Sequence, residues 1–128
     1  MNEAGMKLEV LPGRFTVCKV PDLSEVAWKE EFLFLGKTDQ EISVVCREEA
    51  QPQNAIVAEQ GWKAFRIGGI LDFSLVGILA RLSGLLAGHQ ISIFAVSTYD
   101  TDYILIKEAQ FLQAVPILEE AGYQIENK

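Results

Sequence analysis

The chain has few of the side chains on which catalysis and metal binding depend. Its 128 residues include one histidine and two cysteines. No serine stands in a Gly-x-Ser-x-Gly elbow, and no glycine-rich stretch matches a phosphate loop or a dinucleotide-binding fingerprint. These absences exclude the common nucleophile–base, zinc and nucleotide sites. We therefore expect no catalytic activity, no cofactor and no metal.

Basic clusters and long apolar runs are missing as well. The chain has 11 basic and 18 acidic side chains, a net charge of −7, and its Lys and Arg residues are scattered. This argues against nucleic acid or an anionic membrane as a partner. The longest apolar runs, such as LVGILARL, are broken well before the ~20 residues that a membrane span requires. The start of the chain lacks a secretion pattern, so we expect a soluble, cytoplasmic protein.

The rare Cys and His residues have structural interpretations. Cys18 and Cys46 interrupt the apolar runs FTVCKV and ISVVC. Two cysteines in such a chain are more often buried thiols than a disulfide, so we predict that both are reduced and buried. His89 follows Gly88 at the expected end of a helix, where a cation is favoured by the helix dipole.

The second half of the chain shows a clear alternation of strands and helices. WKAFRI (62–67) alternates as a strand, and Leu75, Leu79, Leu82 and Leu86 recur at helical spacing. We expect this helix to be capped by Asp72 or Ser74 at its start. We expect Gly88, with positive φ, at its end.

Two further strands, a second helix and a last strand follow. ISIFAVS and DYILIK are strand-like, FLQAVPILEEAG is helical with Phe111, Val115, Leu118 and Ala121 on one face, and YQIE can close the sheet. Pro116 conflicts with a regular helix, so the helix should either begin near that residue or be kinked there, and we favour a late, irregular start.

The first half repeats this order with much shorter helical pieces. RFTVCKV, EFLFLGK, ISVVC and NAIVAEQ are the strand-like runs, and PDLSEVAW and REEAQPQ lie where helices would be. We therefore predict an α+β fold of two tandem βαββαβ repeats, residues 1–60 (degenerate) and 61–128, which meet near Gly61. Because each repeat is small, the two should share a core or interface.

The connection STYDTD (97–102) contains more chemistry than a turn needs. Three hydroxyl groups, one tyrosine and two carboxylates stand there without a glycine. A hairpin loop needs only two to five residues, so the flanking runs should be antiparallel neighbours. The polar side chains could pair across the strands and bond the turn backbone, or they could form the rim of a ligand site.

The element order and the stretch STYDTDYIL resemble the ACT domain, a small ferredoxin-like regulatory module that commonly binds amino acids. LPGRFTVCKV, EISVVC, GWKAFRI and STYDTDYILIK are similar to short bacterial proteins made of two ACT-like repeats, and to the ACT repeats of CASTOR-type arginine sensors. The resemblance extends from about Leu8 to Ile125.

The resemblance implies a site for a free amino acid between a strand–helix loop and a neighbouring strand. Transferred residue by residue, the loop side is Asp72, Phe73, Ser74, Leu75 and Val76, and the strand side is Thr98, Tyr99 and Asp102. Amides at a helix start suit an α-carboxylate, and Asp102 suits an ammonium group or a cationic side chain. The arginine sensors carry acidic residues just before the helix, where this chain has Ser74 and Leu75, so arginine itself is not implied.

Two functional hypotheses follow. The first is a non-catalytic regulatory protein that binds an amino acid or a similar zwitterion, in a homodimer with pockets at an interface between repeats. The second is an interaction or dimerisation module without a small-molecule ligand, because a fold can persist after its ligand is lost.

Overall fold

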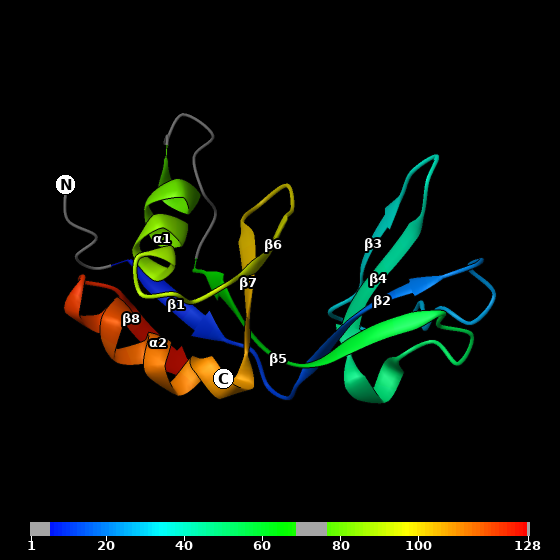
Figure 1. The fold of residues 1–128 in the computed structure, drawn as a ribbon, viewed down its shortest axis with the longest axis horizontal. Helices are drawn as coiled ribbons and strands as arrows, with labels where there is room; N and C mark the ends of the chain where they lie inside the picture. Colours follow the sequence, from blue (N-terminus) through cyan, green and yellow to red (C-terminus); the bar gives the residue numbers. More distant parts are fainter. Residues whose placement is uncertain (1–5, 69–76, 128) are drawn as a thin grey trace. The chain divides into compact units, whose positions relative to one another are not determined.

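The computed structural model describes residues 6–68 and 77–127, which divide into two compact units. Unit 1 comprises Met1–Pro12 and Lys63–Lys128, and unit 2 comprises Gly13–Trp62. The elements are β1 (Lys7–Val10), β2 (Phe15–Val20), β3 (Phe34–Lys37), β4 (Ile42–Arg47), the short 3₁₀ helix η1 (Glu48–Ala50), β5 (Val57–Ile67), α1 (Ile78–Ala87), β6 (Phe94–Ser97), β7 (Asp102–Lys107), α2 (Glu108–Glu120) and β8 (Gln124–Asn127). Figure 1 shows this order along the chain.

Both units use the same strand order. Unit 2 has the order β3-β4-β2-β5, with each neighbouring pair antiparallel. Unit 1 has the order β6-β7-β5-β1-β8. If β1 is left out, the first, second, third and fourth strands of each unit take identical places. The α+β prediction is confirmed, and β5 is the last strand of one unit and the first of the next.

The strand β5 runs through the position where the repeats were expected to meet. The sequence analysis separated NAIVAEQ from WKAFRI, but the structure has one strand of 11 residues. Gly61 has a φ of +83°, and the register with β2 shifts between Phe15 and Val17. This is the geometry of a β-bulge, in which a glycine absorbs the extra residue and the strand continues. The two expected strands are therefore one continuous strand, while the two units do divide close to Gly61, between Trp62 and Lys63.

The N-terminal strand β1 was not predicted. It lies between β5 and β8, antiparallel to β5 and parallel to β8. Leu8 and Val10 are buried in the core of unit 1, whereas Lys7 is exposed. The segment through Pro12 thus belongs with unit 1, a grouping that differs from the expected division at residue 60.

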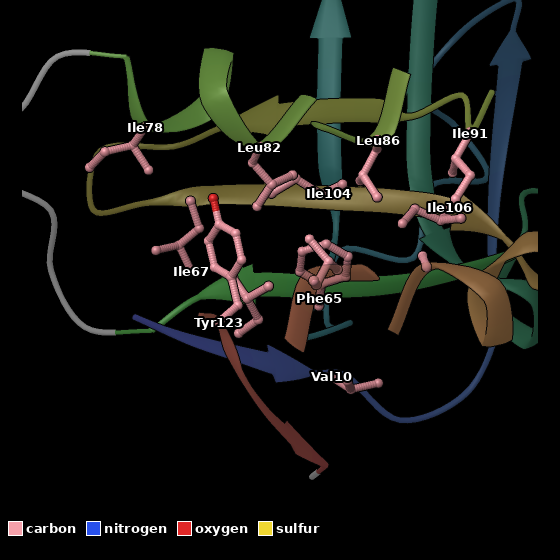
Figure 2. Close-up of a cluster of buried hydrophobic side chains, with 13 residues drawn as sticks. Val10, Phe65, Ile67, Ile78, Leu82, Leu86, Ile91, Ile104, Ile106 and Tyr123 are labelled. Carbon is pink, nitrogen blue, oxygen red and sulfur yellow. The ribbon is translucent and has the colours of Figure 1, made fainter. Parts of the chain in front are cut away.

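The core of unit 1 lies between its two α-helices and its sheet. Figure 2 shows Leu82 and Leu86 of α1 directed toward Ile104 and Ile106 of β7. Ala114 and Leu118 of α2 complete the same buried cluster, together with residues of β1 and β5. Because apolar side chains recur every three or four residues in a helix and every second residue in a strand, each element presents one apolar face to this cluster.

Helix α1 differs from its prediction at both ends. It begins at Ile78 with Gly77 as the N-cap residue, whereas the predicted capping residues, Asp72 and Ser74, lie outside the described residues. Gly88 has an ordinary helical φ of −62°, and Gln90 instead adopts the positive φ of 64°. The amides of Gln90 and Ile91 donate to Ala87 and Leu86, both at 3.0 Å, as in a Schellman motif. The reversal falls at Gln90 because Ile91 then packs into the core.

Helix α2 also starts earlier than expected. It runs from Glu108 with Pro116 inside it, so the prediction of a late start is wrong. An internal proline costs about 3 kcal/mol. Phe111, Ala114 and Leu118 on either side of Pro116 pack against the core, and their burial offsets that cost.

Unit 2 has a smaller core without an α-helix in its described residues. Cys18, Val26, Val44 and Cys46 are buried together, and the turns of residues 21–33 cover them. Both cysteines are buried free thiols, as predicted. Burial raises the pKa of Cys18, and burial followed by the neighbouring Cys18 raises the pKa of Cys46 to about 12.

Candidate functional site at the β6–β7 turn

The strands β6 and β7 are antiparallel neighbours, as predicted. Phe94 faces Leu105, and Ser97 faces Asp102 as the closing pair of the hairpin. Four residues, 98–101, make the connection. The polar stretch STYDTD is thus a turn plus the pair of residues that closes it.

The hydroxyl group of Thr98 belongs to the turn. Its Oγ1 donates to the carbonyl of Thr101 at 3.0 Å and accepts from the Thr101 amide at 3.4 Å, and the Thr98 amide donates to the same carbonyl at 2.8 Å. Tyr99 follows at the tip, where its side chain is 83% exposed. The turn interpretation therefore accounts for Thr98.

The closing pair places a carboxylate at the end of the sheet. Asp102 is half-buried, and its Oδ1 accepts a hydrogen bond of 2.6 Å from the Ser97 hydroxyl. Its Oδ2 accepts no hydrogen bond from residues 6–68 or 77–127. Strand alternation puts Asp102 on the same face as Ile104 and Ile106, the face that packs against the helices. This carboxylate can accept from a cationic or ammonium group.

The turn is fixed to the end of β5 by a residue that sequence reasoning missed. Thr101 is buried, and its Oγ1 donates to the carbonyl of Ile67 at 2.8 Å. Gly68 follows Ile67, and the segment 69–76 begins directly after it. Thr101, in the turn of the predicted site, therefore contacts the end of the strand that precedes the segment 69–76. The only sequence signal was a third hydroxyl residue in a polar turn.

The loop side of the predicted site cannot be placed. Asp72, Phe73, Ser74, Leu75 and Val76 lie outside the described residues. Its two flanks are described, Gly68 at the end of β5 and Gly77 at the start of α1, where the Arg81 amide donates to the Gly77 carbonyl at 2.8 Å.

The cationic side chain beside Ile67 is engaged on the other face of the sheet. The Nε of Arg66 donates to Glu9 at 2.8 Å, and its Nη1 lies 3.5 Å from the Tyr103 hydroxyl. The hydrogen bond with Glu9, followed by the one with Tyr103, raises the pKa of Arg66. Because neighbouring strand residues point to opposite faces, Arg66 points away from the face that carries Asp102.

Other candidate features of the described chain are structural. Among residues 6–68 and 77–127, no three His, Cys, Asp or Glu side chains gather as metal ligands would. His89 places Nδ1 3.1 Å from the Leu85 carbonyl near the end of α1, in agreement with the helix-terminal interpretation. Neither described helix has the length and apolar character needed to cross a membrane.

Comparison with known proteins confirms the resemblance. A family model described as the ACT domain matches residues 57–120. The cytosolic arginine sensors for mTORC1 subunit 1 of Rattus norvegicus and Homo sapiens are each 32% identical over 85 residues, which cover 61% of this chain and 26% of theirs. The chain thus spans about a quarter of the length of these curated relatives.

Solved structures confirm the fold over nearly the whole chain. A crystal structure of an Agobacterium tumefaciens protein is 26% identical, with a TM-score of 0.85 and coverage of 96% of this chain and 93% of that one. A Vibrio cholerae protein of unknown function, 19% identical, has a TM-score of 0.71 with coverage of 91% and 90%. The regulatory subunit of aspartate kinase from Thermus thermophilus, 10% identical, has a TM-score of 0.61 with coverage of 89% and 95%. At such low identity the last two show the fold alone.

Proposed function

Because the chain belongs to the ACT domain family, we propose that it is a regulatory module that binds an amino acid or a similar zwitterion and has no catalytic activity of its own. Relatives with about a third of identical residues are named as arginine sensors, and proteins of the same fold include a regulatory subunit of aspartate kinase. The names of these relatives support a sensing role.

The Asp102 carboxylate is the observation that carries this proposal. It is half-buried, one of its oxygens is oriented by Ser97, and its other oxygen accepts nothing from the described residues. Partial burial strengthens a charge-assisted hydrogen bond, because the local dielectric constant is lower than that of water. An α-ammonium group or a cationic side chain is the matching ligand group.

The proposed site combines this carboxylate with the loop that precedes α1. On the strand side, Tyr99 and the backbone of Thr98 would form the rim. On the loop side, the sequence resemblance assigns Asp72, Phe73, Ser74, Leu75 and Val76, with backbone amides for the ligand's α-carboxylate. We propose a homodimer as the working state, with these sites at an interface between repeats.

A thermal-shift screen of the chain against the twenty proteinogenic L-amino acids tests the proposal. A ligand at a hundred times its dissociation constant adds about 2.7 kcal/mol of stability, which shifts the melting temperature by several degrees. We expect one amino acid, or a chemically related group, to give such a shift. No shift with any of them at millimolar concentration contradicts amino-acid binding.

A dimerisation module without a ligand is the second candidate, and the outer surface of α1 favours it. A hollow of about 560 Å³ lies against the helix and carries no charged side chain; it is lined by Ala80, Ser83, Gly84, Ala87, Gln90, Ile91, Ser92 and Ile93. Because the chain has a net charge of −7, two copies repel each other least where their uncharged surfaces meet. Light scattering on the parent and on Ala80→Glu tests this surface, because a dimer formed through it dissociates when the charge is added. A protein that dimerises in this way and shows no thermal shift with any amino acid is the module without a ligand.

A further inference from the structure

The end of β5 is held from both sides at the point where the segment 69–76 begins. On one side, the Thr101 hydroxyl donates to the Ile67 carbonyl at 2.8 Å. On the other side, the Gly68 amide donates to the Lys7 carbonyl of β1, also at 2.8 Å. Two consecutive backbone groups are thus fixed to two different neighbouring segments.

The Thr101 contact is not required to form the turn. The β3–β4 turn of unit 2 has the same internal bonds: the Thr38 amide donates to the Glu41 carbonyl at 2.9 Å, and the Glu41 amide donates to the Thr38 hydroxyl at 3.2 Å. At the position of Thr101, that turn has the exposed Glu41. A four-residue turn of this kind therefore forms without a buried hydroxyl, and the Thr101–Ile67 bond does something further.

Gly68 leaves room for the close approach of β5 to β1. A Cβ atom at this position would lie 3.2 Å from Lys7 Cβ and 3.4 Å from the Lys7 carbonyl oxygen. Because that neighbour is a backbone segment of the same sheet, an added methyl group would have to displace the end of β5 or the start of β1.

We propose that Thr101 and Gly68 are positioning residues for the amino-acid site: they fix the turn that carries Asp102 to the end of β5, and the end of β5 to β1. This inference rests on the proposed function. Neither side chain needs to touch the ligand. Their effect is to hold the turn and its Asp102 carboxylate in place before binding, which reduces the ordering cost that binding would otherwise include.

Four variants separate positioning from general stability. Thr101→Val removes the hydroxyl and keeps the shape, whereas Thr101→Ser keeps the hydroxyl. Gly68→Ala crowds β1. Thr16→Val is the matched control, because Thr16 and Thr101 are the two buried polar residues of the described chain, and Thr16 donates to Gln51 at 2.8 Å within unit 2.

The measurements are calorimetric titration with the L-amino acid that gives the largest thermal shift for the parent protein, and the melting temperature of each unliganded variant. We expect Thr101→Val to bind about tenfold more weakly, the size typical of one lost hydrogen bond to a well-ordered group. We expect Gly68→Ala to bind more weakly as well, because the added methyl group displaces the end of β5. Thr101→Ser should bind like the parent. In Thr16→Val the melting temperature should fall about as much as in Thr101→Val. Its dissociation constant should stay within about twofold of the parent value.

Two results would overturn the inference, and they differ from each other. If the parent protein binds none of the twenty amino acids, the proposed function fails and the positioning role with it. If the parent binds and Thr101→Val binds equally well despite a lower melting temperature, only the positioning role fails, and the Thr101–Ile67 bond serves stability alone. Should Thr101→Val not fold, Gly68→Ala and Thr101→Ser decide the question by the same titration.

Discussion

The β3–β4 and β6–β7 hairpins have turns that are close copies but differ at their closing pairs. Residues 38–41 and 98–101 share the same amide and threonine hydrogen bonds, and both hairpins are visible in Figure 1. In unit 2 the pair that closes the hairpin is Lys37 and Ile42, whereas in unit 1 it is Ser97 and Asp102. The shared bonds are those that make the turn. The differences, a paired carboxylate and a buried Thr101, are the features on which the proposed ligand site rests.

The same contrast holds between the units as a whole. In unit 1, α1 and α2 cover one face of the sheet and a large buried cluster forms. In unit 2, turns and the three-residue η1 take the places of the helices, and the buried cluster is small. A strand order can therefore persist after its helices have been reduced to turns. The unit that keeps its helices is also the unit that carries the proposed site.

The largest expected effect is on the core of unit 1. Leu82→Ala removes a fully buried side chain of α1 and should lower the free energy of unfolding by about 2–5 kcal/mol. Val44→Ala, also fully buried but in the smaller cluster of unit 2, should cost less because fewer carbon atoms are removed. Urea denaturation measures both. An equal or larger loss for Val44→Ala would show that unit 2 is not the weaker of the two.

The next effect concerns the closing pairs. Asp102→Asn should weaken amino-acid binding by about 1–3 kcal/mol, the range for hydrogen bonds to charged groups, with little change in the fold. Asp100→Asn, in the same turn, should do much less. Asp39→Asn in the unit 2 turn should have no effect on binding. If calorimetry finds the same affinity for all three variants and the parent, the Asp102 carboxylate serves only to close the hairpin.

Two glycines should give smaller effects of opposite sign. Gly61 has a φ of +83° at the β-bulge, where an L-residue is strained, so Gly61→Ala should cost about 1 kcal/mol. Gly84 lies on the exposed face of α1 with no atom within 4 Å of an added Cβ, so Gly84→Ala should stabilise by about 0.5–1 kcal/mol. Urea denaturation gives both values. If Gly84→Ala instead lowers the free energy of unfolding, another group must contact the exposed face of α1 in solution.

The smallest effect at neutral pH involves the two thiols, both of which lie in unit 2. An unfolded cysteine has a pKa of about 8.5, and folding raises the pKa of Cys46 to about 12. The protonated thiol is therefore favoured by the fold, so stability is fully present below about pH 8.5 and decreases as the pH rises toward 12. Unfolding free energies measured between pH 7 and 10 should decline above pH 8.5, and less steeply in Cys46→Ala.

Thiol labelling extends this test to the independence of the units. At pH 7.5 both cysteines should react slowly, because they are buried and protonated. If unit 2 opens by itself, labelling will be faster than global unfolding allows, and Leu82→Ala in unit 1 will not accelerate it. Labelling that accelerates in proportion to the stability lost in Leu82→Ala would show that the two units open together.

The sequence by itself determined the class of fold, the two long helices, the hairpin around STYDTD and the burial of both cysteines. These follow from local pattern: apolar residues at helical spacing, alternation in strands, and a connection too short for a parallel crossover. The absence of catalytic motifs was also apparent at this level. Each of these features is encoded within about fifteen consecutive residues.

Only the tertiary structure decided the remaining features, since each depends on residues far apart in the chain. β1 became a central strand because β5 and β8, more than fifty residues away, supply its partners. Pro116 stays inside α2 because the core on both sides of it fixes the helix. Thr101 gained its role from the Ile67 carbonyl, 34 residues earlier. A local pattern states what a residue can do, whereas the long-range contacts that bury it decide which of those possibilities lowers the free energy.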